Sequence, residues 1–332
     1  MRGSMLNQFK EKIAGYNFEP SANRSFLGRT ALELPEEKKG RALVKLEDID
    51  VMQLYMPVDG SSDLEYSANL KEKVRRIAEA SSEERAPQIQ ILPEELTASM
   101  LPQFQGYSCS ATQIPIGIDT EELRVQHLQL EDNIMLIIGE SQSGRTNLLR
   151  HALHACKDIP CYLFDAKNAG LRAYAECENI FYAQSANDSE RLLDNLAEKL
   201  RQYEEAYQQE AERGVTMQEY IRVKAPMYIL IDVVQDLVSR VEEEEKLDIL
   251  AQAAEMGIPI LVTSDERLRG RGNDFLRMLA DAKRGIVLGN IRNQSVFSYT
   301  GIREDNNQVD IGYIVERSGI LRIKLAYAHE KK

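Results

Sequence analysis

Blocks of apolar residues alternate with amphipathic blocks along the second half of the chain. Apolar runs of strand length occur in "NIMLIIG", "IPCYLFDA", "PMYILIDV", "IPILVTS" and "GIVLGN". Such runs are typical of strands buried on both faces of a parallel sheet. Helical spacing of apolar residues predicts a helix from Asp188 to about Arg213, which Gly214 ends. It also predicts a helix in "EEEEKLDILAQAAEMG", which ends at Gly257. The alternation predicts an α/β fold, an open and mostly parallel sheet with helices on both faces.

Two β-rich segments near the two ends of the chain resemble each other. They are "FLGRTALELPEEKKGRALVKLEDIDVMQLYMPV" and "FSYTGIREDNNQVDIGYIVERSGILRIKLAYA". Each has an aromatic residue before a first glycine (Gly28, Gly301), a second glycine (Gly40, Gly312), a short apolar run and an alternating strand. The similarity indicates either a duplicated module or a chance likeness of two β-rich segments.

These features predict four parts. Residues 1–4, in "MRGSM", are interpreted as the remainder of an expression tag. Residues 5–66 are expected to be the C-terminal tail of a preceding, similar module. Residues 67–87 are expected to be a helical linker, with Leu70, Val74 and Ile77 at helical spacing and Pro87 at its end. Residues 88–332 form the main domain, in which "IPIGIDTEELRVQHLQL" predicts a hairpin or two edge strands.

The segment "GESQSGRT" fits the phosphate-loop pattern G-x-x-x-x-G-[KR]-[ST] and directly follows a buried strand. Backbone amides of such a loop form an anion-binding nest at a helix N-terminus. The threonine hydroxyl can ligate Mg²⁺, and the basic residue reaches the β- and γ-phosphates of a nucleotide. The alternative is a glycine turn without a ligand. The candidate nucleotide-binding residues are Gly139, Glu140, Ser141, Gln142, Ser143, Gly144, Arg145, Thr146 and Asn147.

Two of the candidate nucleotide-site positions, residues 145 and 233, differ from those of an active ATPase motor. Arg145 stands where the motif has lysine, and a forked guanidinium is no equivalent of a compact ammonium. Asp232 ends the apolar strand "MYILID", as a Walker B aspartate associated with Mg²⁺ would, although a helix N-cap is the alternative. The next residue is Val233, where an active motor has a glutamate, and valine cannot act as a general base.

Charged residues also follow two other predicted strands. Asp165 and Lys167 follow "CYLF", at the edge of an α/β sheet that faces a ligand crevice, or they are ordinary loop charges. Asp265 follows "ILVTS" at the position of a phosphate sensor. That position is normally neutral and polar, and an aspartate there would repel a γ-phosphate.

The chain of 332 residues has a net charge of −12. This balance favours proteins, peptides or nucleotides over nucleic acid as partners, because DNA binding depends on basic surfaces. Four cysteines without a C-x-x-C pair, accompanied by four histidines, argue against a zinc site and favour reduced thiols.

The order of "IPIGID", "LIIGESQSGRTN", "YLFDAKNAGL", "YEEAYQQEAERGVTMQEY", "YILIDVVQDL", "GIPILVTSDE", "GIVLGN" and "GYIVERSGILRIKLAYA" resembles FtsK/SpoIIIE-type RecA-like ATPase domains. In particular it resembles the most C-terminal domain of EssC/EccC-type ATPases of type VII secretion. The resemblance covers residues 88 to about 328. It implies a RecA-like P-loop NTPase fold, with Asp232 as the Walker B aspartate and Asp265 at the position of the sensor glutamine.

The resemblance also implies a membrane-anchored parent with tandem ATPase domains on the cytoplasmic side of a bacterial membrane. Its implied partners are a small helical WXG-type effector, recognised through a C-terminal signal, and neighbouring ATPase domains. ATP and Mg²⁺ are the implied cofactors. The departures at Arg145, Val233 and Asp265 all fall on positions that carry out ATP hydrolysis in the family. They predict a degenerate ATPase with weak or structural nucleotide binding and little or no hydrolysis in isolation.

Three other functions stay open at this point. The domain could be a competent ATPase that turns over only on hexamerisation or substrate binding. It could be an FtsK-like DNA translocase, which the acidic balance disfavours. It could also be a structural adaptor that binds no nucleotide.

Overall fold

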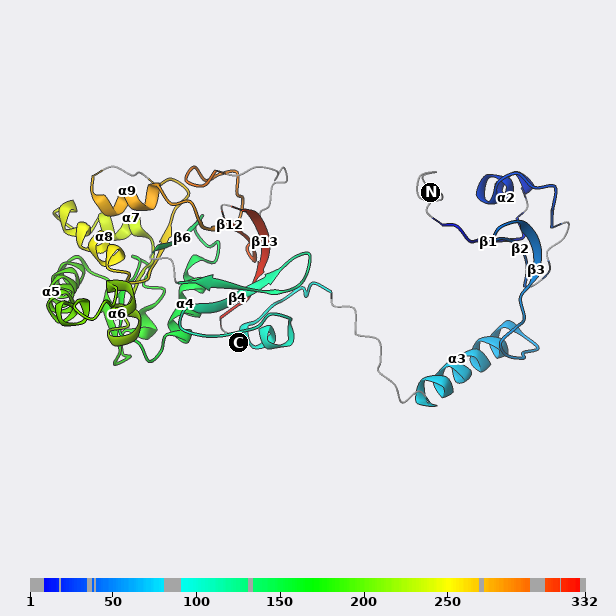
Figure 1. Ribbon diagram of the computed structural model, residues 1–332, viewed down its shortest axis with the longest axis horizontal. Helices are drawn as coiled ribbons and strands as arrows, with labels where there is room; N and C mark the ends of the chain where they lie inside the picture. The colour runs from blue at the N-terminus through cyan, green and yellow to red at the C-terminus, as the bar shows by residue number, and fades with distance from the viewer. Residues whose placement is uncertain are drawn as a thin grey trace. The chain divides into compact units, whose positions relative to one another are not determined.

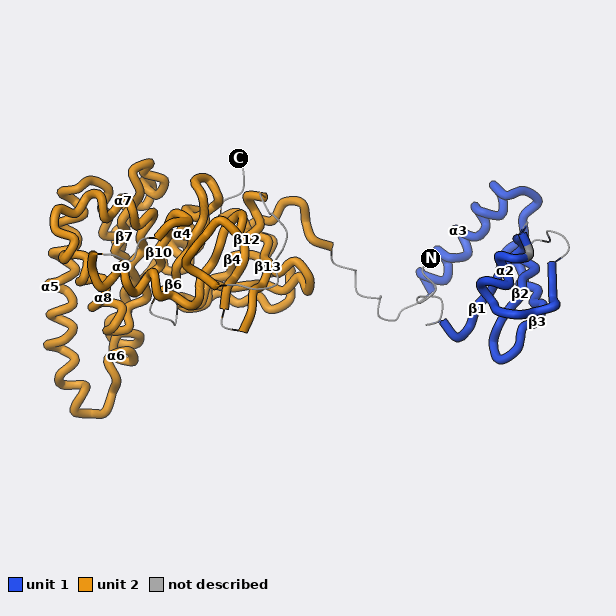
Figure 2. The backbone as a smooth tube through the Cα atoms, turned by 90° about the horizontal axis from the view of Figure 1, so that it is seen from above, with its two compact units in different colours: residues 1–88 blue, residues 89–332 orange. Residues whose placement is uncertain are grey.

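The computed structural model describes residues 9–17, 19–34, 38, 40–80, 91–130, 134–268, 272–298, 308–316 and 318–328. The chain divides into two compact units, residues 1–88 and 89–332, which Figure 2 colours separately. Residues 1–4, Pro87, Gln88 and Gly301, which the sequence singles out, lie outside the described residues.

The first unit contains a three-stranded antiparallel sheet and two helices. The sheet has the order β1 (Lys12–Gly15), β2 (Arg41–Lys45), β3 (Ile49–Gln53). Helix α2 (Pro20–Leu27) lies in the connection between β1 and β2, and helix α3 (Asp63–Ala80) follows the sheet. The buried core of this unit is small and consists of Ala14, Leu27, Leu34 and Leu43.

Helix α3 contains most of the segment that the sequence assigns to a helical linker. None of its 18 residues is buried. Val74 and Ile77 have helical spacing, yet they are 57% and 60% exposed. The amphipathic pattern therefore predicts the helix correctly. Within the described part of the chain, no other element covers the apolar side chains of Val74 and Ile77.

The second unit is built on one ten-stranded sheet (Figure 1). Its order is β5-β4-β13-β12-β11-β6-β10-β9-β7-β8. The six strands from β11 to β8 are parallel to one another, and the four from β5 to β12 pair antiparallel. The strands are β4 (Gln113–Asp119), β5 (Val125–Gln129), β6 (Ile134–Gly139), β7 (Cys161–Phe164), β8 (Ile180–Ala183), β9 (Tyr228–Ile231), β10 (Ile260–Ser264), β11 (Gly285–Leu288), β12 (Ile311–Glu316) and β13 (Gly319–Leu325).

Helices cover both faces of this sheet, and the alternation within β6 shows why. Leu136 and Ile138 point into one core, whereas Met135 and Ile137 point into the other. The first core packs against α5 (Ala186–Ala211), α6 (Met217–Lys224), α7 (Val234–Val238), α8 (Asp248–Glu255) and α9 (Asp274–Ala280). The second packs against α4 (Arg145–Ala155). The predicted α/β architecture is confirmed.

The two segments that resemble each other in sequence adopt the same strand arrangement. Strands β2 and β3 form an antiparallel hairpin, and β1 pairs antiparallel with β2. Strands β12 and β13 form an antiparallel hairpin, and β11 pairs antiparallel with β12. The three strands of the first unit therefore match the last three strands of the second.

Local details differ from the sequence-based expectation. The segment "EEEEKLDILAQAAEMG" is a 3-10 turn (Glu244–Leu247) followed by α8, so its helix is shorter than expected. The sequence analysis did not identify the short elements β8, α6, α7 and α9, whose few residues carry little periodic signal. The predicted hairpin is confirmed as β4 and β5, with β5 at the edge of the sheet. No helix in the described part of the chain is long and apolar enough to cross a membrane.

Candidate nucleotide-binding site

The loop between β6 and α4 has the backbone of an anion-binding nest. Gln142 and Gly144 adopt positive φ angles of 66° and 101°. A Cβ at Gly139 would lie 2.4 Å from the Ser143 hydroxyl oxygen, so only glycine fits under the loop. Within the described residues, the amide groups of Gly144, Arg145 and Thr146 donate to no backbone or side-chain oxygen. Three amides at a helix N-terminus therefore remain available for a phosphate.

The Arg145 side chain is engaged in an ion pair. It is 10% exposed, and its Nη1 donates to Oδ1 of Asp265 at 2.5 Å. Asp265 follows β10, which lies beside the loop strand β6 with Ser264 opposite Ile138. Two positions that depart from an active motor are thus joined to each other as an ion pair.

Asp232 is fully buried at the end of β9 and is held by two hydroxyl groups. Thr146 Oγ1 donates to its Oδ2 at 3.0 Å, and Thr263 Oγ1 donates to its Oδ1 at 2.8 Å. Burial raises the pKa of Asp232 above its ordinary value, although both hydroxyl groups lower it. Asp232 is not the N-cap of α7, since Val233 occupies that position.

Val233 has a backbone conformation that is unfavourable for a β-branched residue. Its φ is 57°, in the left-handed region. Its amide donates to Thr263 Oγ1 at 2.7 Å, which fixes this strained turn directly after Asp232. The strained backbone thus presents an isopropyl group where hydrolysis requires a base.

Gln235 and Ser264 complete the site, and the sequence analysis did not identify their roles. Gln235 Nε2 donates to Ser264 Oγ at 2.9 Å, and Gln235 Oε1 accepts from the Asp265 amide at 3.3 Å. This side chain fixes the backbone that carries Asp265. The sequence signal for this role was the position of Gln235, a polar residue in the first turn after the strand that ends at Asp232.

The remaining charged residues at this sheet edge anchor loops. Asp165 is fully buried and accepts from the Leu171 amide at 3.0 Å and from the Tyr182 hydroxyl at 2.8 Å. Lys167 Nζ lies 3.5 Å from Oδ1 of Asp236. These contacts hold the two side chains at the edge of the sheet, and their place in a ligand crevice stays a prediction.

The side chains of the loop have different surroundings. Asn147 joins α4 to the C-terminal strand, because its Nδ2 donates to the Ala326 carbonyl at 2.8 Å and its Oδ1 accepts from the Ala328 amide at 2.9 Å. Residues 140–143 line a cavity of about 240 Å³ together with residues 288–290 and 308–309. Ligand pockets usually measure about 300 to 1,000 Å³. This cavity is therefore small for a whole nucleotide.

The loop backbone fits a phosphate group. Within the described residues, the Ser143 hydroxyl is buried without a hydrogen-bond partner. Thr146 and Asp232 are the residues that would hold Mg²⁺ beside a bound nucleotide. The cation of Arg145 is already paired, and Val233 provides no general base.

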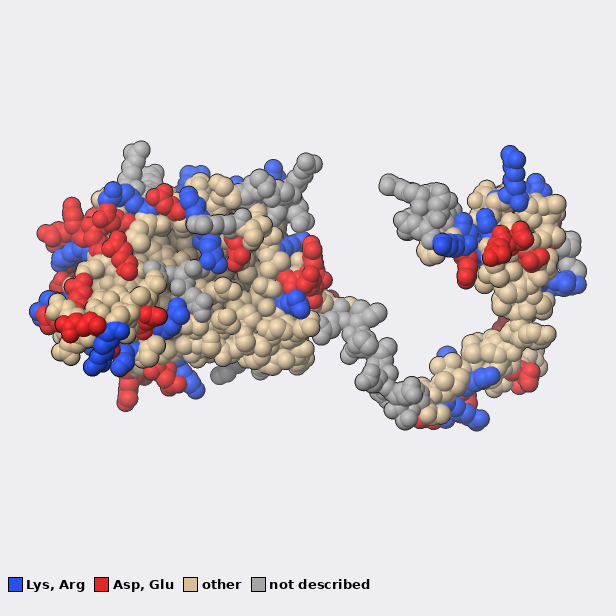
Figure 3. All heavy atoms as spheres, viewed as in Figure 1, with Lys and Arg blue, Asp and Glu red and all other residues tan. Residues whose placement is uncertain are grey.

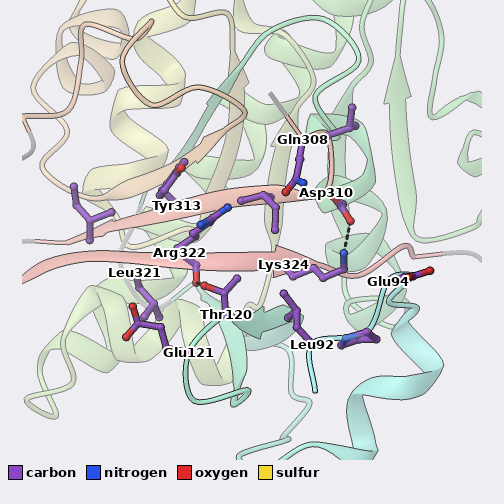
Figure 4. Close-up of a pocket in the computed structure, with 14 residues that line it drawn as sticks. Leu92, Glu94, Thr120, Glu121, Gln308, Asp310, Tyr313, Leu321, Arg322 and Lys324 are labelled. Atoms are coloured by element: carbon purple, nitrogen blue, oxygen red, sulfur yellow. Dashed lines mark hydrogen bonds and ion pairs between the residues drawn. The ribbon is translucent and has the colours of Figure 1, made fainter. Parts of the chain in front are cut away.

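A second, larger cavity lies on the sheet face at β12 and β13 (Figure 4). Its volume is about 1100 Å³. Tyr313 and Arg322 form its floor from neighbouring strands, and Lys324 forms an ion pair with Asp310 at 2.6 Å. Leu92 and Leu321 add apolar walls. We refer to this cavity as the β12–β13 groove.

The sheet and the loop define a RecA-like P-loop NTPase fold. No family model matches the chain. The chain is 25% identical over 327 residues, 95% of its length, to the ESX secretion system protein EccC of Geobacillus thermodenitrificans. It spans only 22% of the length of that relative.

Solved structures give the same result for the fold. EssC (ATPases 2 and 3) from Geobacillus thermodenitrificans superimposes with a TM-score of 0.78 at 23% identity, over 99% of this chain and 63% of that one. Thermomonospora curvata EccC (ATPases 2 and 3), in complex with a signal sequence peptide, gives 0.54 at 22% identity, over 90% of this chain and 55% of that one. The resemblance to EssC/EccC-type ATPases of type VII secretion, predicted from the motifs, is confirmed.

Proposed function

We propose that the chain is part of a type VII secretion motor on the cytoplasmic side of a bacterial membrane. In this proposal, residues 88–332 form a degenerate ATPase domain that binds nucleotide weakly or structurally. The similarity to EccC along 95% of the chain supports the first part. The main observation behind the second is the site itself, where three free loop amides lie beside a paired Arg145 and an apolar Val233.

Calorimetry on the full chain with Mg-ATP, followed by a turnover assay on the same sample, tests this proposal. We expect weak binding without turnover, and binding at least about fivefold weaker in Arg145→Ala. Arg150→Ala is the matched control, because it removes the same charge from α4 but contacts the Gly170 carbonyl instead of the loop. Turnover by cross-linked oligomers would instead support an assembly-dependent ATPase, and an absence of binding would leave a structural adaptor.

We further propose that the β12–β13 groove binds the C-terminal signal of a small helical WXG-type effector. The signal-peptide complex of the Thermomonospora EccC supports peptide recognition by such a domain. The groove offers apolar contacts at Leu92 and Leu321 and the guanidinium of Arg322, while Lys324 is paired with Asp310. Apolar pockets with a few convergent polar groups are the usual form of binding sites.

Fluorescence polarisation with peptides from effector C-termini tests the groove. Leu321→Asp should abolish binding, because it places a charge on the apolar wall. The matched control is Val223→Asp, which adds the same charge to an exposed position of α6 outside the groove. Equal effects of the two variants would place the peptide elsewhere.

We also propose that residues 5–66 are the end of a preceding ATPase module and that neighbouring ATPase domains are partners. The match between β1-β2-β3 and β11-β12-β13 supports this origin. Nucleic acid is not a partner in this proposal. Acidic side chains cover the part of the second unit around α5 and α8 in Figure 3, and the chain has a net charge of −12.

A further inference from the structure

Three carboxylates lie close to the phosphate loop. Glu140 is the first residue after Gly139, and its Oε1 accepts from Asn293 Nδ2 at 3.1 Å. Asp265 and Glu266 follow β10, the strand beside β6. Burial and the neighbouring Glu140 raise the pKa of Glu266, which indicates that these two acidic groups face each other. The rim of the loop is therefore negatively charged on the β10 side.

This side is where a terminal phosphate would lie in a phosphate-loop protein. Loop amides and the helix N-terminus hold the inner phosphates, and the basic residue of the motif reaches outward to the γ-phosphate. Here the guanidinium of Arg145 is already held by Asp265 in an ion pair. The backbone amide of Asp265 donates to Gln235 Oε1, and this hydrogen bond keeps the Asp265 carboxylate beside the loop.

We propose that the Arg145–Asp265 ion pair makes this loop a site that prefers nucleoside diphosphates to triphosphates. The inference rests on the proposed nucleotide binding and adds the class of nucleotide. A diphosphate can use the free amides of Gly144, Arg145 and Thr146 without disturbing the pair. A γ-phosphate must separate Arg145 from Asp265 and then face that carboxylate at close range.

The burial of Arg145 makes this separation unfavourable. Arg145 is 10% exposed, so the guanidinium would lose a charge-assisted hydrogen bond in a poorly solvated place. Asp265 is 53% exposed, but its backbone is tied to α7 through Gln235. The carboxylate therefore acts as an internal anion that takes the place of the γ-phosphate.

Calorimetric titrations of the full chain with Mg-ADP and Mg-ATP test the proposal. For the wild-type chain we expect Mg-ADP to bind about five to ten times more tightly than Mg-ATP. Asp265→Asn should tighten Mg-ATP binding about tenfold and change Mg-ADP binding less than twofold. The matched control is Glu266→Gln, which removes the same charge from the next residue, beside Glu140. It should change the ratio of the two Kd values less than threefold.

Two further variants separate the pair from general effects. Asp265→Ser also removes the charge and should reproduce the result, which guards against a folding defect specific to asparagine. Arg145→Ala combined with Asp265→Asn should lose the gain in Mg-ATP binding, because the gain requires a freed guanidinium. Thermal melting of each variant checks that the fold is retained.

The outcomes distinguish the inference from the proposed function. Equal Kd values for the two nucleotides in the wild-type chain would overturn the inference and leave nucleotide binding intact. The same holds if Asp265→Asn tightens both nucleotides equally. If neither nucleotide binds the wild-type chain or Asp265→Asn, the proposed nucleotide binding fails, and this inference fails with it.

Discussion

The two matching three-stranded arrangements differ in what surrounds them. In the second unit, β11 also pairs with β6 and β13 also pairs with β4. In the described part of the first unit, the outer edges of β1 and β3 pair with no strand. Ile323 of β13 is fully buried, whereas Val51 of β3 is 46% exposed. The same arrangement of three strands is therefore largely buried in the second unit and largely exposed in the first.

This difference shows that a hairpin's own sequence does not set its stability. The small sheet has four buried apolar residues in its core, so little apolar area stabilises it. In the large sheet, β11 pairs with β6 and the end of β13 pairs with β4, and much of the three strands lies in the two large cores. An unfinished sheet in the first unit is what the proposed end of a preceding module would leave.

The largest expected effect compares one apolar side chain in each arrangement. Ile323→Ala should destabilise the second unit by about 3 kcal/mol, because it opens a cavity in a closed core. Val51→Ala should change stability by less than about 0.5 kcal/mol. Urea denaturation of the full chain measures both. Similar losses for the two variants would show that β3 is covered as well as β13.

Hydrogen exchange compares the hairpins without mutation. Amides of β12 and β13 should exchange about 100-fold more slowly than those of β2 and β3, since the latter open with the small sheet. Mass spectrometry of peptides that cover each hairpin measures this ratio. Equal protection would contradict the view that the first unit is an incomplete sheet.

Glycines in the first strand of each arrangement give a smaller effect. A Cβ at Gly285 of β11 would lie 2.4 Å from the Leu136 carbonyl oxygen and 2.3 Å from Phe297 Cζ. Gly285→Ala should therefore cost about 2 kcal/mol through overpacking. A Cβ at Gly15 of β1 meets nothing within 4 Å. Gly15→Ala should be neutral or slightly stabilising, as thermal melting of both variants can establish.

The smallest effect concerns Asp232, a charge that only the large sheet buries. Burial raises its pKa, so its contribution to stability is fully present below the ordinary pKa and is lost as pH rises through the folded value. Asp232→Asn should therefore stabilise the chain at pH 7 by about 1 kcal/mol. The gain should shrink as the pH falls through the raised pKa of the wild-type carboxyl. A destabilised variant at pH 7 would show that the two hydroxyl bonds outweigh burial.

Much of the large domain could be predicted from sequence because its signals are local. The continuous apolar run of β6 and the glycines at positions 139 and 144 specify a strand and a loop whose backbone adopts positive φ. The helix after the loop begins at Arg145, within one residue of the expected start. Short elements such as β8 and α7 carried too few residues to show a period.

The sequence by itself determined the α/β order of elements, the phosphate-loop backbone and the loss of a base at Val233, because each depends on neighbouring residues. Only the tertiary structure decided what Arg145 does. Its partner Asp265 is 120 residues away and reaches it because β10 lies beside β6 in the sheet. Likewise, Thr263 meets Asp232 only because β9 and β10 are neighbours. Long-range pairing of strands brings these side chains together, and no local pattern encodes it.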